Sequence, residues 1–71
     1  MLSKQHQILG RNINRLRNER GLTLDELGYR SGIDPSHLGY AERGEANLTV
    51  AKIFGIAKAL KVKASDLFNK I

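Results

Sequence analysis

The side chains best suited to chemistry gather in one short polar stretch, residues 35–43, which is predicted to be helical. Ser36, His37 and Tyr40 can each donate or accept hydrogen bonds, and few apolar residues accompany them. Small residues at the start of this helix would allow close approach to a surface, and its free N–H groups and positive dipole suit a phosphate. The pattern therefore indicates contacts with the base edges and phosphates of a nucleic acid.

Other chemistry finds little support in the sequence. The chain has no cysteine, and its two histidines, His6 and His37, lie far apart, so neither a disulfide nor a zinc site is predicted. No Ser-His-Asp arrangement has motif support, and no glycine-rich loop of the phosphate-cradling kind occurs. We therefore expect no enzyme activity, no catalytic residue, no metal, no cofactor and no small-molecule ligand.

Size and charge agree with a small nucleic-acid-binding domain. The 71 residues allow one domain over 1–71, and 12 basic against 7 acidic residues give a net charge of +5. Because the basic residues are spread along the chain, charge alone favours nucleic acid without deciding for it. No apolar run approaches the roughly 20 residues of a membrane span, and the start lacks an apolar signal region. We expect a cytoplasmic, nucleoid-associated protein that does not bind membranes.

Helix starts are well marked, which makes the elements that carry the polar stretch predictable. Thr23 followed by Glu26 forms a capping box, Asp34 precedes Pro35 at the first helical position, and Thr49 offers a third cap. No stretch alternates with the period of a strand. The fold class predicted is all-α, with helices at about 5–19, 24–31, 35–43, 50–60 and 64–70.

The apolar spacing predicts which helix faces form the core. The expected core residues are Leu9, Ile13 and Leu16 in the first helix, Val50, Ile53, Phe54, Ala57 and Leu60 in the fourth, and Leu67 and Phe68 in the last. Ile56 and Ile71 lie off this stripe. With Phe68 they are expected to form a self-complementary patch for a homodimer, although they could instead complete the core of the monomer.

The two short central helices are joined by a tight glycine-containing turn, Ser31-Gly32-Ile33-Asp34, which is typical of a helix-turn-helix. Further motifs follow one another along the chain in a specific order: Leu16-Arg17, Gly21-Leu22-Thr23, Glu26-Leu27, Glu42-Arg43-Gly44, Ile56-Ala57-Lys58-Ala59-Leu60 and Asp66-Leu67-Phe68. Over about residues 7–68 the chain resembles the lambda-repressor-like (Cro/XRE) helix-turn-helix DNA-binding domains. The resemblance implies a compact five-helix fold.

The resemblance also assigns roles to positions. The base-facing positions of the recognition helix would be Pro35, Ser36, His37, Gly39 and Tyr40, and positions near the DNA backbone would be Thr23, Arg43, Asn47 and Thr49. Arg17 and Glu42 match a structural ion pair of the family. Leu24 stands where relatives often carry a phosphate-binding glutamine, so that contact is not expected here.

The segment Asn47-Leu48-Thr49 is similar to the controller proteins of restriction-modification systems. This implies a transcriptional regulator that acts as a homodimer on a pseudo-palindromic operator in double-stranded DNA and regulates its own operon, with RNA polymerase as a further candidate partner. Three alternatives stay open: a phage-type repressor or Cro, an antitoxin-like regulator, and a protein-interaction module without DNA. Tyr40 could instead be half-buried, and His37 could be an inert surface residue.

Overall fold

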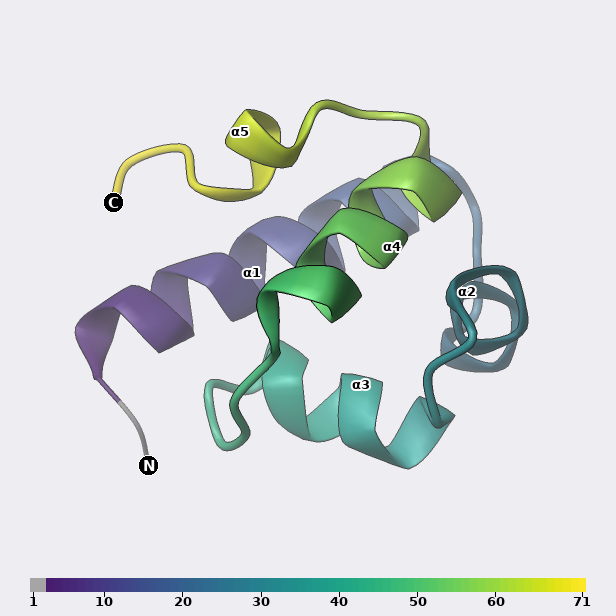
Figure 1. The fold of residues 1–71 in the computed structure, drawn as a ribbon, viewed down its shortest axis with the longest axis horizontal. Coiled ribbons are helices and arrows are strands. Elements are labelled where there is room, and N and C mark those ends of the chain that lie inside the picture. The colour runs from purple at the N-terminus through teal and green to yellow at the C-terminus, as the bar shows by residue number, and fades with distance from the viewer. Residues whose placement is uncertain (1–2) are drawn as a thin grey trace.

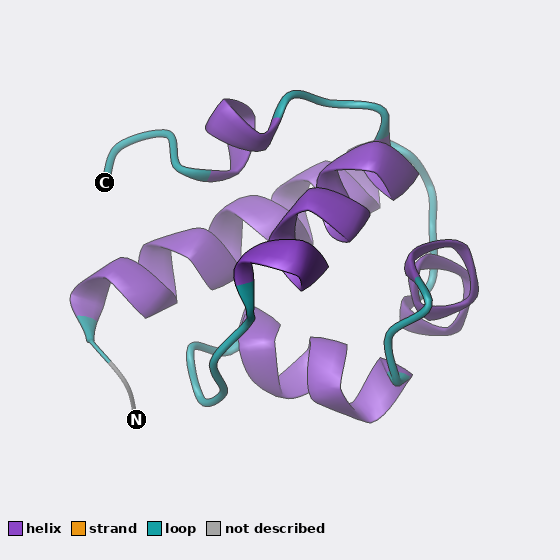
Figure 2. Ribbon diagram, viewed as in Figure 1, coloured by secondary structure: helices purple, strands orange, loops and turns teal. Residues whose placement is uncertain are grey.

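The computed structural model describes residues 3–71 and is all-α over that range, as the sequence predicts (Figure 1, Figure 2). Its helices are α1 (Lys4–Glu19), α2 (Leu24–Ser31), α3 (Pro35–Glu42), α4 (Val50–Leu60) and α5 (Ala64–Leu67). The last helix ends three residues before its predicted end, and the chain after it forms a turn in which Lys70 has a φ of 71°. No helix in the described part of the chain is long and apolar enough to cross a membrane.

The helices surround one core and leave α3 at the edge of the molecule. In Figure 1, α1 and α4 run through the middle, α5 lies along one edge and α3 along the opposite edge. α2 and α3 pack against each other across a turn in which Gly32 has a φ of 73°. The backbone N–H groups of Gly32 and Ile33 both donate to the carbonyl of Gly28, and this closes the helix-turn-helix.

The predicted caps are present, which explains why short helices form here. The Thr23 hydroxyl accepts from the Glu26 N–H at 3.0 Å, and the Thr23 N–H donates to the Glu26 carboxylate at 2.8 Å. The hydrogen bonds that the Glu26 carboxylate receives from Thr23, first from its backbone and then from its side chain, hold the pKa of Glu26 below its usual value. The Asp34 carboxylate accepts from the Ser36 N–H at 2.8 Å and the Thr49 hydroxyl accepts from the Lys52 N–H at 3.1 Å, which caps α3 and α4. Each cap satisfies N–H groups that the first helical turn would otherwise leave without a partner.

The prediction for the buried face of α4 was wrong in part. Val50 and Phe54 are 69% and 59% exposed, whereas Ile56 is fully buried. The buried stripe is formed by Ile53, Ile56, Ala57 and Leu60, which share the i, i+3, i+4, i+7 spacing of one helix face. Ile56 is thus part of the monomer core, and burial removes it from the predicted dimer patch.

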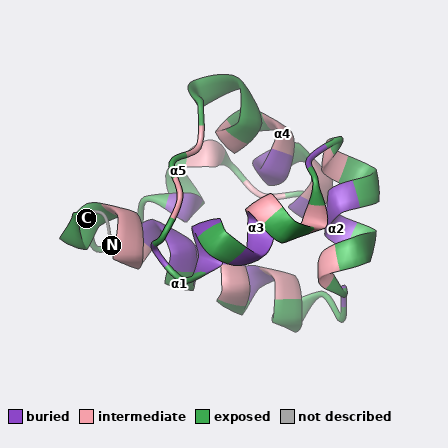
Figure 3. Ribbon diagram, turned by 90° about the horizontal axis from the view of Figure 1, so that it is seen from below, coloured by how far each residue is buried: buried purple, intermediate pink, exposed green. Residues whose placement is uncertain are grey.

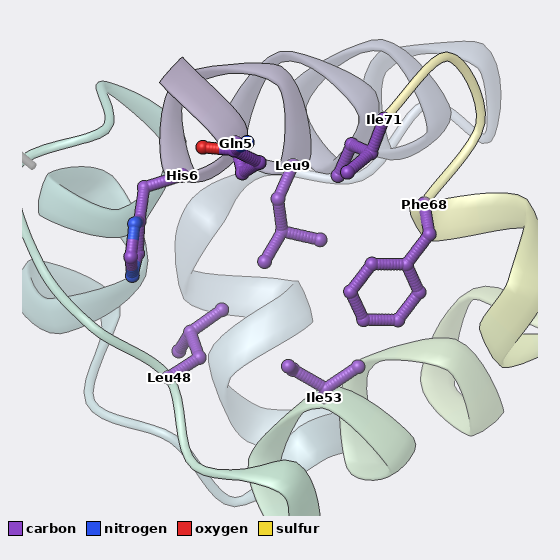
Figure 4. A pocket seen from close by; sticks show the side chains of 7 residues that line it. All are labelled: Gln5, His6, Leu9, Leu48, Ile53, Phe68 and Ile71. Atoms are coloured by element: carbon purple, nitrogen blue, oxygen red, sulfur yellow. The ribbon is translucent and has the colours of Figure 1, made fainter. Parts of the chain in front are cut away.

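At the end of the chain, only one of the two expected core residues is buried. Leu67 is fully buried, whereas Phe68 is 42% exposed. Phe68 follows the last residue of α5 and faces Ile53 across an apolar pocket (Figure 4). Ile71 lines the same pocket and is also exposed. Phe68 and Ile71 therefore remain available on the surface.

The contact between α2 and α3 depends on the absence of a side chain at Gly28. A Cβ built there would lie 2.7 Å from the carbonyl oxygen of Ile33 and 2.9 Å from the ring of Pro35. Both are rigid groups at the turn, so neither can move aside easily. At Gly39, by contrast, a Cβ would meet only flexible side-chain atoms of Arg43 and Leu24 at 3.4 and 3.6 Å. The two helical glycines should therefore respond differently to substitution.

We expect Gly28→Ala to lower the free energy of unfolding by about 1–3 kcal/mol, because the added methyl overpacks the turn. Gly39→Ala is the matched control and should raise it by up to about 1 kcal/mol, because alanine is the better helix former. Urea denaturation followed by circular dichroism measures both values. Equal effects of the two substitutions would contradict the packing described for Gly28.

Candidate nucleic-acid interface

A buried ion pair fixes the position of α3 against α1. The Arg17 Nε donates to the Glu42 carboxylate at 2.7 Å, and the Asn14 amide donates to the same carboxylate at 2.9 Å. A second Arg17 nitrogen donates to the Leu22 carbonyl at 2.8 Å. The side chains of Arg17 and Glu42 are only 12% and 6% exposed. The expected structural pair is therefore present, and it joins the end of α3 to both α1 and the start of the α2 region.

The environment of this pair favours its charged form. The hydrogen bond that Arg17 donates to Glu42 and the nearby carboxylate charge raise the pKa of Arg17 above its usual value, although burial opposes them. No buried side-chain nitrogen or oxygen lacks a hydrogen-bond partner in the described part of the chain. Such complete satisfaction is what a buried charge pair requires in order not to destabilise the fold. The pair therefore holds α3 in place, and its charged groups are already occupied by each other.

The outer face of α3 projects from the molecule and borders a shallow groove. Figure 3 shows α3 across the middle of the face seen from below, beside α2. Ser36 and Tyr40 are exposed on it. The groove is lined from α3 by Pro35, Ser36, Gly39, Tyr40 and Arg43, and from α2 by Leu24 and Asp25. Four of the five predicted base-facing positions therefore meet at this groove.

Tyr40 and Arg43 form one unit at the edge of the groove. Tyr40 is 51% exposed, so it is half-buried, but it lies outside the core cluster and lines the groove. The Arg43 guanidinium lies over the Tyr40 ring, 4.9 Å from its centroid, and its Nε donates to Glu45 at 3.2 Å. Gly39 is buried beneath the Arg43 and Leu24 side chains. Cation–π attraction to Tyr40 thus directs the Arg43 guanidinium across the face of α3.

His37, the fifth predicted base-facing residue, turns away from the groove. Its Nε2 lies 3.0 Å from the backbone carbonyl of Asn47, so the ring contacts the loop between α3 and α4. The side chain of Asn47 in turn meets His6 Nε2 at 2.5 Å, across 41 positions of sequence. The sequence predicts no role for His6, and no local motif indicates a contact between the start of α1 and this loop.

The remaining predicted residues, Thr23, Asn47 and Thr49, are exposed at the starts of helices or next to them. Thr23 caps α2, and the first two residues of α2, Leu24 and Asp25, line the groove. Thr49 caps α4. Their hydroxyls accept from the helix backbone, and each retains one proton to donate. Hydroxyl and amide donors are therefore exposed at the start of α2, in the loop after α3 and at the start of α4, and Arg43 adds a guanidinium at the end of α3. No cluster of three or more potential metal ligands occurs among residues 3–71.

Comparison with known proteins gives a consistent result. A helix-turn-helix family model matches residues 13–67. The chain is 41% identical over 61 residues to the uncharacterized HTH-type transcriptional regulator y4dJ of Sinorhizobium fredii, covering 86% of this chain and 79% of that protein. It is 31% identical to the control protein C.SmaI of Serratia marcescens, over 90% of this chain and 76% of the relative.

A solved structure extends the comparison to the fold. The restriction-modification controller protein C.AhdI from Aeromonas hydrophila superposes with a TM-score of 0.90 at 32% identity, over 93% of this chain and all of the other. The predicted five-helix fold is thereby confirmed.

We expect Arg17→Ala to lower the free energy of unfolding by about 3–5 kcal/mol, because it leaves the Glu42 carboxylate buried without its counter-charge. Arg15→Ala is the matched control, since it removes an ion pair between Arg15 and Glu19 whose side chains are 49% and 54% exposed. That substitution should cost no more than about 1 kcal/mol. Both values come from urea denaturation. A similarly small effect at Arg17 would contradict the bracing role of the pair.

Proposed function

Because the chain belongs to the helix-turn-helix family of transcriptional regulators, we propose that it binds double-stranded DNA with sequence preference through the outer face of α3. The observation that carries the proposal is the polar face of α3, which borders a groove. The C-terminal end of α3 is fixed by the buried ion pair between Arg17 and Glu42. A helix held rigidly by its inner side can enter the major groove without rearranging the domain.

The side chains divide into two groups by what they offer. We assign Ser36 and Tyr40 to base edges or thymine methyl groups, because both are exposed and line the groove. Arg43, Asn47 and Thr49 are assigned to phosphates, because they present donors beside it. No arginine or lysine stands at the start of α3, so bidentate contacts to guanine are few. Sequence-dependent DNA shape and bending then supply part of the specificity.

We propose that the active form is a homodimer. Four large apolar residues are exposed on α4 and at the end of the chain: Val50, Phe54, Phe68 and Ile71. Val50 and Phe54 lie one turn apart on α4, and Ile53 next to them faces Phe68 across the apolar pocket (Figure 4). A twofold contact through this surface buries the same residues on both copies. Two α3 helices would then read half-sites about 34 Å apart in a pseudo-palindromic operator.

We propose further that the protein controls a restriction-modification operon that includes its own gene. The support is the similarity to C.SmaI, named a control protein, and to C.AhdI, named a restriction-modification controller protein. If dimerisation precedes DNA binding, operator occupancy rises steeply with protein concentration. A regulator of this kind acts as a switch that follows its own accumulation. A phage-type repressor or an antitoxin-like regulator would use the same DNA-binding face.

Selection of binding sites from random duplexes, followed by a salt titration, tests DNA binding. We expect the selected sites to share a symmetric consensus. The affinity of the protein for a duplex that carries it should fall by orders of magnitude between about 50 and about 200 mM salt, since phosphate contacts release counterions. Tyr40→Ala should relax the preference at one base position by roughly 1–3 kcal/mol. Tyr29→Ala is its control, because Tyr29 is an exposed tyrosine on α2 outside the groove lining. No duplex selectivity at either salt would favour a protein-interaction module instead.

Sedimentation equilibrium tests the dimer. Phe54→Asp should raise the dimer dissociation constant by at least about tenfold, because it places a charge in the apolar contact. The residue is already largely exposed in the monomer, so the free energy of unfolding of the monomer should change little. Tyr29→Asp provides a control at a still more exposed aromatic residue. If Phe54→Asp leaves the dissociation constant unchanged, the dimer does not form through this surface.

A further inference from the structure

Three residues form a continuous hydrogen-bonded chain from the start of α1 to the loop after α3. The Ser3 hydroxyl lies 2.6 Å from His6 Nδ1, and the backbone N–H of His6 donates back to the same hydroxyl oxygen. The other ring nitrogen, Nε2, lies 2.5 Å from Oδ1 of Asn47. Figure 4 shows the His6 side chain extending from α1 at the edge of the apolar pocket, whose lining on the side of the loop is Leu48.

The donors in this chain have one consistent direction. An amide oxygen only accepts, so His6 Nε2 must carry the proton that it shares with Asn47. In the neutral ring Nδ1 is then an acceptor, and the Ser3 hydroxyl donates its single proton to it. Ser3 thereby selects the Nε2–H form of His6, and His6 in turn selects which end of the Asn47 amide faces inward. The order of donation is Ser3 to His6 to Asn47.

We propose that Ser3 and His6 are positioning residues for DNA binding, which orient the Asn47 amide with its NH₂ group toward a phosphate. Phosphate oxygens only accept hydrogen bonds, so an amide that presented its oxygen would repel them. With Oδ1 held by His6, the two N–H donors of the exposed Asn47 side chain make no hydrogen bond within the described part of the chain and remain for a ligand. This inference rests on the proposed DNA binding of the chain.

A second anchor holds the backbone at the same residue. His37 Nε2 lies 3.0 Å from the Asn47 carbonyl oxygen and donates to it. Side chain and main chain of Asn47 are thus held by two histidines, one from α1 and one from α3. The loop is fixed on both sides before any ligand arrives. Pre-organisation of this kind reduces the conformational entropy that binding must remove.

The direction of the hydrogen bonds from Ser3 through His6 to Asn47 can be measured in the free protein. The ¹⁵N chemical shifts of the imidazole nitrogens report which nitrogen carries the proton at a pH where the ring is neutral. We expect His6 in the Nε2–H form in the parent protein and a mixture of forms in Ser3→Ala. Ser3→Thr keeps the hydroxyl and the cap of α1, so it should restore the Nε2–H form. If His6 of the parent protein is in the Nδ1–H form, the chain runs in the opposite direction and the proposal is overturned.

The consequence for binding is measured on the selected duplex at fixed salt. Ser3→Ala should weaken binding about three- to tenfold, and Ser3→Thr should restore it. Asn47→Asp keeps an acceptor for His6 but replaces the donors by a charge, so it should weaken binding more than Asn47→Ala does. Neither Ser3 nor Asn47 lines the apolar pocket, so both tests leave the proposed dimer surface intact.

The two measurements separate this inference from the proposed function. If the parent protein binds no duplex selectively, DNA binding fails as a function, and the proposal that Ser3 and His6 serve it fails as well. If it binds, but Ser3→Ala changes the tautomer of His6 without changing affinity, only the positioning role is overturned. Equal affinities of Asn47→Asp and the parent protein would likewise overturn that role.

Discussion

The buried contact between Arg17 and Glu42 is the interaction on which the rest of the arrangement depends. Glu42 is the last residue of α3, and its carboxylate receives donors from Arg17 and Asn14 on α1. Arg17 also reaches the carbonyl of Leu22, just before α2 begins. One guanidinium therefore ties together the three helices that determine where the face of α3 points. Gly28, within α2, fixes the opposite end of α3 by close packing against the Ile33 carbonyl and the Pro35 ring.

For the proposed DNA binding, this bracing matters because α3 carries few strong recognition groups. Its outer face offers a serine, a tyrosine and an arginine drawn over that tyrosine, with a glycine between them. Weak individual contacts discriminate between sequences only if their positions are well defined, since a mobile helix could adapt to many sequences. In the proposed recognition of DNA, the rigidity of the scaffold and the fixed loop at Asn47 compensate for the small number of bidentate groups.

Local features of the fold were predictable from the sequence, and distant contacts were not. The caps at Thr23, Asp34 and Thr49 depend on residues two or three positions away, so helix starts could be read directly. The buried face of α4 depends on its neighbours in space, and the apolar residues on it allowed two stripes. In the structure Ile56 lies in the core and Phe54 is exposed. The contact between His6 and Asn47 joins two separate segments, and neither segment carries a signal for the other.

The central claim is that the outer face of α3 meets DNA. The most direct measurement is the change of backbone and side-chain NMR resonances when the selected duplex is added to isotopically labelled protein. We predict that the largest changes occur at Ser36, Tyr40 and Arg43 and in the loop at residues 44–49, with little change at Tyr29 on the outer side of α2. Changes confined to α4 and α5, or no changes on the face of α3, would contradict the account.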